Sequence, residues 1–315
     1  MVVKKNQTVV TEFLLLGFGD LHDLKILLFA FLLIIYVMAL TGNALVIVLV
    51  VISQNLHSPM YIFLSQLSLS EILFTSNILP GMLWLTLEGG GKIPIIRCFS
   101  HLYLLTVCTI TQCLLLTTMS FDRYVAICKP LNYTVIMTFG LQLQIVTLCW
   151  SSGFTLSIVL FVFLYRLEFC GPDTINHFYC DVGPVLELSC SDISSVKLVT
   201  SMLSTPLLLC PFVFIMATYI SIFNTILKMS SSIRRQKAFS TCSSHLTVVC
   251  LYFGSLASIY VFSPKLSSSN VNKNLSLIYI LVTPLFNPLI YSLRNQDIRG
   301  AITKYIHLIG TWQLR

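Results

Sequence analysis

Long runs of apolar residues alternate with short polar segments along almost the whole chain. Each run holds about 20 residues, the length that an α-helix needs to cross a bilayer, and is bounded by charged residues, proline or glycine. No run is a second copy of another, as the halves of an inverted-repeat transporter would be. The pattern predicts an all-α membrane protein, a seven-transmembrane helix bundle with spans at residues 26–51, 59–84, 98–121, 141–164, 198–227, 239–262 and 273–293.

The composition excludes a water-soluble domain. Of the 315 residues, 56 % are hydrophobic and only 10 % are charged, whereas about a quarter of the residues of a soluble protein are charged. The first apolar run begins near Ile26 and continues for about 25 residues, which is too long for the hydrophobic region of a cleaved signal peptide. We therefore expect an outer N-terminus at residues 1–25, a bundle in the lipid bilayer at 26–293 and a cytoplasmic tail at 294–315.

The tail predicts one further short helix. Its apolar residues share one face of a helix over residues 295–309, whereas Arg299 and Lys304 lie on the other faces. A helix of this kind lies in the membrane interface. The tail contains no cysteine that could be acylated.

Charged residues are distributed unevenly between the two sides of the predicted bundle. With the N-terminus outside, ten of the 19 Lys and Arg residues lie inside, and nine of the 12 Asp and Glu residues lie outside. The inner side is then positive, in agreement with the positive-inside tendency. We expect a multi-pass plasma membrane protein with an extracellular N-terminus and a cytoplasmic C-terminus. The sequon at Asn6 is then a candidate site of N-glycosylation.

Four of the eleven cysteines fall on the predicted outer side: Cys98, Cys170, Cys180 and Cys190. An even number of cysteines on the oxidising face of a membrane predicts two disulfides. A bridge from Cys98 would join the long outer loop, residues 165–197, to the top of the third span. Cys98 can pair with Cys180, which leaves Cys170 for Cys190, or Cys98 can pair with Cys190 itself.

A charged triplet, Asp122-Arg123-Tyr124, follows the third apolar run, and Pro130 then prevents any continuation of the helix. Adjacent opposite charges at the end of such a run suit a boundary between membrane and cytosol. The wider segment 119–133 reads MSFDRYVAICKPLNY. The triplet alone is weak support for a function, because Asp-Arg is also a common surface pair.

Five stretches in this order resemble the odorant-receptor branch of the rhodopsin-like G-protein-coupled receptors. They are Gly42-Asn43, LHSPMYIFLSQLSL at 56–69, MSFDRYVAICKPLNY at 119–133, KAFSTCSSHL at 237–246 and PLFNPLIYSLRN at 284–295. The four outer cysteines match as well, and the resemblance covers nearly the whole chain. It departs from the usual pattern at Glu71, where the superfamily generally has aspartate, and at Thr218, where the branch usually has serine.

The resemblance implies a polar core inside the membrane, formed by Asn43, Glu71 and Asn287. A carboxyl group within a membrane helix costs about 2.5–3.5 kcal/mol on insertion scales, so Glu71 should face the bundle and have partners. Related receptors can hold a sodium ion at this site. Glutamate has one methylene more than aspartate, so that the sodium geometry does not transfer directly. The alternative is a hydrogen-bonded Glu71 that only stabilises packing. No other metal and no cofactor are expected.

Helical spacing groups residues that can line one cavity, which by resemblance lies beneath the disulfide-tied loop. The stripes are mostly apolar with a few hydroxyls, as in many small-molecule pockets. Leu105 occupies the depth at which amine receptors carry aspartate, so we expect small, neutral, hydrophobic odorants. Tyr260 and Thr109 are the favoured polar contacts. The stripes are Leu102, Leu105, Thr106, Thr109 and Cys113; Leu203 and Leu207; Tyr252, Leu256, Ile259 and Tyr260; and Ser276, Leu277, Ile280 and Thr283.

The resemblance also implies an inner switch that couples to a stimulatory, olfactory-type G protein. Asp122 would hold Arg123 in the inactive state, and outward movement of the sixth span would free Arg123 for the G protein. Four prolines, Pro206, Pro211, Pro284 and Pro288, are candidate bend points. The switch and coupling residues are Asp122, Arg123, Tyr124, Tyr219, Lys237, Asn287, Pro288 and Tyr291.

Functions of other classes find little support. The chain has no zinc-protease, nucleophile-elbow or phosphate-loop motif, so we expect no enzyme. A transporter or channel would show repeated halves or several intramembrane charges, and Glu71 alone is thin support. No nucleic-acid partner is expected. A chemoreceptor of the same fold for an endogenous small molecule outside the nose is the main alternative.

Overall fold

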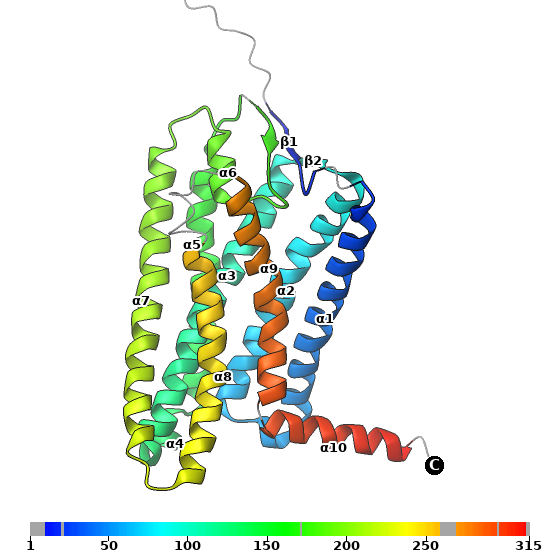
Figure 1. The fold of residues 1–315 in the computed structure, drawn as a ribbon. Coiled ribbons are helices and arrows are strands. Elements are labelled where there is room, and N and C mark those ends of the chain that lie inside the picture. Colours follow the sequence, from blue (N-terminus) through cyan, green and yellow to red (C-terminus); the bar gives the residue numbers. More distant parts are fainter. Residues whose placement is uncertain (1–9, 20–21, 171, 259–268, 295, 313–315) are drawn as a thin grey trace, which may run out of the picture.

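The structure is a computed structural model that describes residues 10–19, 22–170, 172–258, 269–294 and 296–312. Seven long helices stand side by side in it and form the bundle (Figure 1). They coincide in order with the seven predicted apolar runs. The helices are α1 (Leu24–Ile52), α2 (Pro59–Glu88), α3 (Ile95–Cys128), α5 (Phe139–Tyr165), α7 (Ser194–Leu227), α8 (Ser232–Ala257) and α9 (Ser269–Arg294).

Six of these helices, all except α8, contain a stretch that is long and apolar enough to cross a membrane. In α8 the apolar part is shorter, Cys242–Ala257, because its first ten residues are mostly polar or basic. Large apolar side chains are exposed along the outside of the bundle, such as Ile26 and Val51 of α1. Such exposure is stable where the surrounding solvent is lipid. The structure is therefore that of a multi-pass membrane protein.

Helix α3 continues beyond the predicted end of the third span at residue 121. It ends at Cys128, and its C-cap residue Lys129 directly precedes Pro130. The helix therefore runs through the charged triplet, which lies within its last two turns, and ends before Pro130 as predicted. The reason is that no helix breaker occurs before Pro130 and that the buried Asp122 has partners in the fold.

A small sheet, which the apolar pattern does not predict, covers the end of the bundle at which α1 begins (Figure 1). This end is termed the outer end, and the opposite end is termed the inner end. Its strands are β1 (Glu12–Leu15), β2 (Gly91–Pro94) and β3 (Thr174–Ile175), in the order β2-β1-β3. Strand β1 is antiparallel to β2 and parallel to β3. Phe13 and Leu15 of β1 are buried, so that the segment before α1 is fixed against both outer loops.

Buried side chains form two clusters. The larger cluster runs through the bundle and includes Phe74, Met119, Tyr252 and Ile280. The smaller cluster lies at the outer end, where Phe13 packs with side chains of α3, α5 and the loop between α5 and α7. The outer loop is thus part of a packed core and not a loose connection.

Short helices and 3₁₀ turns lie at the two ends of the bundle. At the outer end, α6 (Val182–Glu187) lies within the long loop, and at the inner end α4 (Tyr133–Ile136) follows α3 (Figure 1). Two 3₁₀ turns, η1 (Gln54–Leu56) and η2 (Pro130–Asn132), also lie in inner loops.

The predicted tail helix is present as α10 (Gln296–Trp312), which extends away from the base of the bundle (Figure 1). Ile298 and Ala301 are buried against the bundle. Asp297 Oδ2 accepts a hydrogen bond of 2.9 Å from the Tyr61 hydroxyl, and the Tyr305 hydroxyl donates to the Ile52 carbonyl at 2.9 Å. The helix is thereby attached to the inner ends of α1 and α2.

Candidate functional site

Two disulfides fix the outer loop. Cys98 at the start of α3 is bonded to Cys180, and Cys170 is bonded to Cys190. Both predicted bridges are confirmed, and the alternative of Cys98 with Cys190 is excluded. The first bridge closes a loop of 82 residues and holds residues 174–180 over the top of the bundle.

Residues 174–180 form a lid over the bundle, and aromatic residues beside Cys180 form the underside of this lid. His177 is buried and its ring lies 4.4 Å from that of Tyr179, while the ring of Phe178 lies 4.2 Å from Phe18. Burial and the positive charge of Lys273 lower the pKa of His177 to about 4. This imidazole is therefore neutral at physiological pH. Nothing in the apolar pattern singles out His177.

Lys273 of α9 links this lid to the bundle. Its Nζ donates a hydrogen bond of 3.0 Å to Asn176 Oδ1 and lies 5.0 Å from the centre of the Phe178 ring. A cation above an aromatic face is attracted by the ring quadrupole. The lid is thus joined covalently to α3 and by polar contacts to α9.

Beneath the lid, three helices bring hydroxyl groups together. The Tyr252 hydroxyl of α8 donates to the Thr109 carbonyl of α3 at 2.6 Å, and the Thr109 and Tyr279 hydroxyls lie 3.3 Å apart. The rings of Tyr252 and Tyr279 lie 6.1 Å apart. Of this set, Tyr279 is not among the predicted pocket residues. It could have been found, because it lies three residues after Ser276 and four before Thr283 on α9.

Cys113 lies one turn further into α3 and contacts α7. Its thiol donates to the Leu207 carbonyl at a distance of 3.1 Å. Pro211 has no N–H, so the carbonyl four residues earlier, at Leu207, lacks its helical donor. The thiol therefore satisfies an acceptor that a proline has freed, and the predicted α3 and α7 stripes meet at this point.

The remaining pocket predictions differ in their surroundings. Leu105, Leu256 and Ile280 are buried in the main cluster, and Leu203, Leu207 and Leu277 are half-buried. Leu102 instead belongs to the outer cluster, and the Thr106 hydroxyl donates to the Tyr103 carbonyl of its own helix. Ile259 and Tyr260 lie outside the described residues.

The polar core lies where α1, α2 and α9 meet. Asn287 Nδ2 donates to Glu71 Oε1 at 2.6 Å, and both side chains are buried. Asn43 Nδ2 donates to the Pro284 carbonyl at 3.1 Å, the acceptor that Pro288 leaves without a helical donor. Glu71 Oε2, Asn43 Oδ1 and Thr283 Oγ1 have no hydrogen-bond partner among the described residues. The three predicted core residues are thus brought to one place.

Gly42 makes the approach of α1 to α9 possible. A Cβ at this position would lie 3.1 Å from the Cβ and Cγ of Pro288, which is tighter than ordinary contact. A larger residue would push the two helices apart and weaken the bond from Asn43. Gly42 and Asn43 therefore act together at this contact.

At the inner end, Asp122 holds Arg123. Arg123 Nε donates to Asp122 Oδ2 at 3.0 Å and a second guanidinium nitrogen bonds the same oxygen, while the Tyr133 hydroxyl donates to Asp122 Oδ1 at 2.8 Å. The carboxylate is fully buried. Burial and the neighbouring Asp122 charge raise the pKa of Tyr133, which therefore remains a neutral donor. Tyr133 was not predicted as a switch residue, although it ends the quoted segment.

A second polar contact joins α7 to α8. The Tyr219 hydroxyl lies 2.5 Å from Nδ1 of His245, and the two rings stack with their centres 5.8 Å apart. His245 is fully buried. It lies within KAFSTCSSHL, a stretch that carries the resemblance, but it was not among the predicted switch residues.

Of the predicted switch residues that remain, Tyr124 has a described side chain. Tyr124 is half-buried with Lys129 Nζ 5.8 Å above its ring. The side chains of Lys237 and Tyr291 lie outside the part of the chain that is described, as does Asn6.

Comparisons with known proteins identify the family. The family model described as olfactory receptor matches residues 32–308. The chain is 41 % identical to Olfactory receptor 10A3 of Homo sapiens over 301 residues, 96 % of each chain. It is 42 % identical to Olfactory receptor 6Q1 of Homo sapiens over 306 residues, also 96 % of each chain, and 42 % identical to Olfactory receptor 226 of Rattus norvegicus over 303 residues, 95 % of this chain and 93 % of the relative. The chain belongs to the olfactory receptor family, which is a family of receptors and not of enzymes.

Proposed function

We propose that this olfactory receptor binds small, neutral, hydrophobic odorants from the outer side and activates a stimulatory heterotrimeric G protein on the inner side. The observation that carries the proposal is the set of hydroxyls on Thr109, Tyr252 and Tyr279, which lies among apolar side chains beneath the lid. The set offers hydrogen bonds to one oxygen function of an otherwise apolar ligand.

The ligand should be neutral because the site has no counter-ion. The α3 residues from Leu102 to Cys113 include no carboxylate, and an amine buried there would remain unpaired. For a ligand of about ten heavy atoms, micromolar binding requires about 8 kcal/mol, or about 0.8 kcal/mol per atom. This value lies between the limit for very small ligands and that for drug-sized ones, so we expect micromolar or weaker affinity.

Chemistry at the two ends of the bundle supports the proposed orientation of the chain. Disulfides persist on the oxidising side of a membrane, so the lid with Cys98 and Cys180 should be extracellular. The opposite end carries the basic residues of the α7–α8 turn. This orientation places the N-terminus and Asn6 outside, where glycosylation can occur, and α10 in the cytosol of a plasma membrane receptor.

Activation would proceed by a shift between two conformations. In the described one, Asp122 accepts hydrogen bonds from both Arg123 and Tyr133, and the contact between Tyr219 and His245 holds α7 against α8. An odorant that prefers the other conformation by a few kcal/mol would suffice to move α8 outward and release Arg123. The G protein would then bind in the opening, where Lys237, Asn287, Pro288 and Tyr291 are the further proposed participants.

Glu71 offers a separate test of the polar core. Its free Oε2, with Asn43 Oδ1 and Thr283 Oγ1, provides oxygen atoms of the kind that bind a sodium ion, as well as water. If sodium binds here, Glu71→Gln should abolish the effect of sodium on odorant potency. Unchanged signalling and unchanged sodium sensitivity would assign Glu71 a packing role alone.

The proposed function is tested with a cAMP reporter in cells that also express an olfactory-type stimulatory Gα. A panel of neutral odorants and a panel of amines should give responses to the neutral compounds. Tyr279→Phe should weaken agonists that carry an oxygen function by about fivefold to tenfold, since it removes one buried hydrogen bond. Tyr103→Phe, whose ring packs against Phe161 of α5 and not in this set, is the matched control.

Three results would contradict the proposal. Responses to amines alone would exclude the neutral pocket, and full activity of Arg123→Ala would exclude the inner switch. Ion flux in the absence of a G protein would favour a transport function.

A further inference from the structure

We propose that the inner half of the bundle retains one anionic phospholipid, with an acyl chain in a groove between α7 and α8 and its headgroup beside Lys228 and Arg235. The inference rests on the proposed orientation, which places this groove in the cytoplasmic leaflet. It does not depend on which odorant binds or on which G protein is activated.

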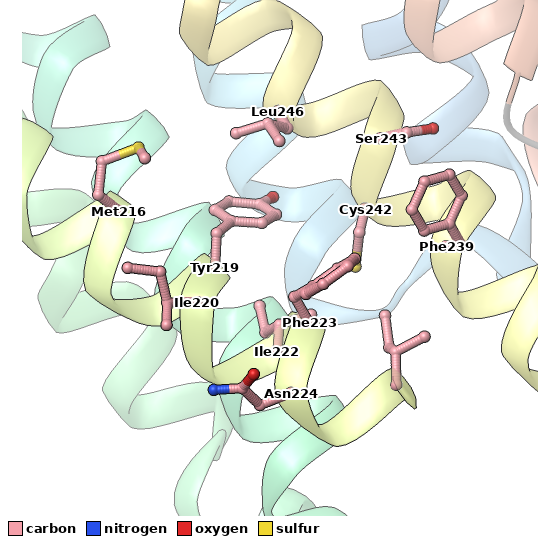
Figure 2. Close-up of a pocket in the computed structure, with 11 residues that line it drawn as sticks. Met216, Tyr219, Ile220, Ile222, Phe223, Asn224, Phe239, Cys242, Ser243 and Leu246 are labelled. Carbon is pink, nitrogen blue, oxygen red and sulfur yellow. The ribbon is translucent and has the colours of Figure 1, made fainter. Parts of the chain in front are cut away.

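The groove is a hollow of about 290 Å³ between the inner halves of the two helices (Figure 2). Tyr219 and Phe223 line it from α7, and Phe239, Cys242 and Leu246 line it from α8. Its volume lies near the lower end of that of small-molecule sites. Because most of its lining is apolar, the groove suits a hydrocarbon chain.

The groove opens towards the membrane. Ile220, Phe223 and Phe239 border it and are 59 %, 50 % and 54 % exposed on the outside of the bundle. Helix α7 contains a membrane-spanning stretch, and α8 contains a shorter apolar stretch, Cys242–Ala257. The side of the groove that exposes Ile220 and Phe223 of α7 therefore contacts lipid and not water. An occupant can therefore enter laterally from the bilayer, and phospholipid is the most abundant candidate there.

Basic residues at the inner end of the groove select the headgroup. Lys228 caps α7 and follows the groove residue Asn224 by four positions. Arg235 precedes the groove residue Phe239 by four, so each basic residue lies at the groove side of its helix end. Both are exposed, and residues 225–244 include no Asp or Glu. Two basic residues at the cytoplasmic surface attract an anionic headgroup.

The same groove borders the switch. Tyr219 faces the groove and also contacts His245 through its hydroxyl, while the buried Cys242 forms part of the opposite wall. A chain in the groove would pack against both α7 and α8 in the conformation in which Asp122 holds Arg123. A lipid that binds this conformation more tightly than the open one would stabilise it.

The experiment uses the full-length receptor, incubated with vesicles of equal amounts of phosphatidylserine and phosphatidylcholine with the same acyl chains. Lipids retained after purification in detergent are counted by native mass spectrometry. Wild type should retain phosphatidylserine preferentially. Lys228→Gln with Arg235→Gln should lower that preference by about fivefold for each charge removed. Lys25→Gln with Lys197→Gln, at the outer end, is the matched control and should have no effect.

Two variants test the groove itself. Ser243→Phe and Ile220→Trp each place a ring in it and should abolish retention of the phospholipid; if one fails to fold, the other still decides. Val213→Phe, on the membrane side of α7 outside the groove, should retain lipid as wild type does.

Equal retention of the two phospholipids by wild type would overturn the proposed headgroup, and undiminished retention in the ring variants would overturn the groove. The measurement needs neither odorant nor G protein. Its failure would therefore leave the proposed receptor function intact, and a receptor that failed to signal could still retain the lipid.

Discussion

The two ends of the bundle are closed by different chemistry. At the outer end, two disulfides, a three-stranded sheet and a separate apolar cluster hold the loop that covers α3. At the inner end, the described polar contacts are hydrogen bonds and one ion pair, such as those of Asp122 and Tyr219, beside the apolar packing of the main cluster. One end is fixed covalently, and the other is held by contacts that can break and form again.

The difference shows where a conformational change can occur at low cost. A ligand of odorant size supplies only a few kcal/mol of preference between conformations. Breaking one or two hydrogen bonds lies within that range, because each contributes about 0.5–1.5 kcal/mol, or about 1.5–3 kcal/mol where one partner is charged. Opening the outer end would require the loss of a packed cluster and a disulfide. We infer that the outer end supports the ligand and that the inner end moves.

The largest effect should follow from removing the outer bridge. Cys98→Ser releases the loop from α3 and should cost about 2–5 kcal/mol of stability, enough to prevent folding and surface expression. Surface expression is measured by antibody labelling of an N-terminal tag. Cys250→Ser, a free cysteine exposed on α8, is the control and should be expressed normally. Normal expression of Cys98→Ser would mean that the sheet and cluster suffice without the bridge.

A fall in pH should have an intermediate effect on the free energy of unfolding. Because the pKa of His177 is lowered to about 4, the unfolded chain takes up the proton first as the pH falls below about 6.5. The free energy of unfolding should then decrease by about 2 kcal/mol by about pH 5. His177→Gln should remove this part of the pH dependence of the melting temperature, whereas His57→Gln, at an exposed position, should not. Equal pH profiles for His177→Gln and wild type would show that the outer end does not depend on His177.

The smallest effect on surface expression should come from the inner end. Tyr133→Phe removes one hydrogen bond to the Asp122 carboxylate, of a kind that contributes about 1.5–3 kcal/mol. Basal cAMP should rise by about tenfold or more, with normal surface expression. Tyr165→Phe, exposed at the outer end of α5, is the control. Unchanged basal activity would indicate that Arg123 alone holds Asp122 and that the inner end is less easily released than we infer.

Features with a strong local signal could be predicted from the sequence. The seven helices follow from apolar length, and the two disulfides follow from four cysteines on one side. That Glu71 has partners was predicted, because a carboxyl group within a membrane helix is costly without them. The members Asn43 and Asn287 were expected from the family resemblance. Helix ends were less certain, and α3 continued past the predicted boundary.

Features that depend on distant pairing could not be predicted. Strand β1 consists of four residues whose apolar alternation is short, and it acquires its partners from loops about 80 and 160 residues away. Tyr279, Tyr133 and His245 each act through a partner on another element, so that spacing along one helix does not reveal their contacts. The pattern determines which side of a helix faces inward, but it does not determine which groups meet there.

The contact between Gly42 and Pro288 has one more consequence. The Asn43 amide donates a hydrogen bond to the Pro284 carbonyl, which Pro288 leaves without a helical donor. Helix α1 therefore supports α9 at the level at which the hydrogen-bond ladder of α9 is interrupted. A helix bends most easily where its hydrogen-bond ladder is interrupted, and α1 prevents α9 from bending towards α1 at that level. The inner part of α9 should therefore turn about a pivot that α1 supplies, which gives the first helix a mechanical part in signalling although it lies apart from both the lid and the Asp122 contact.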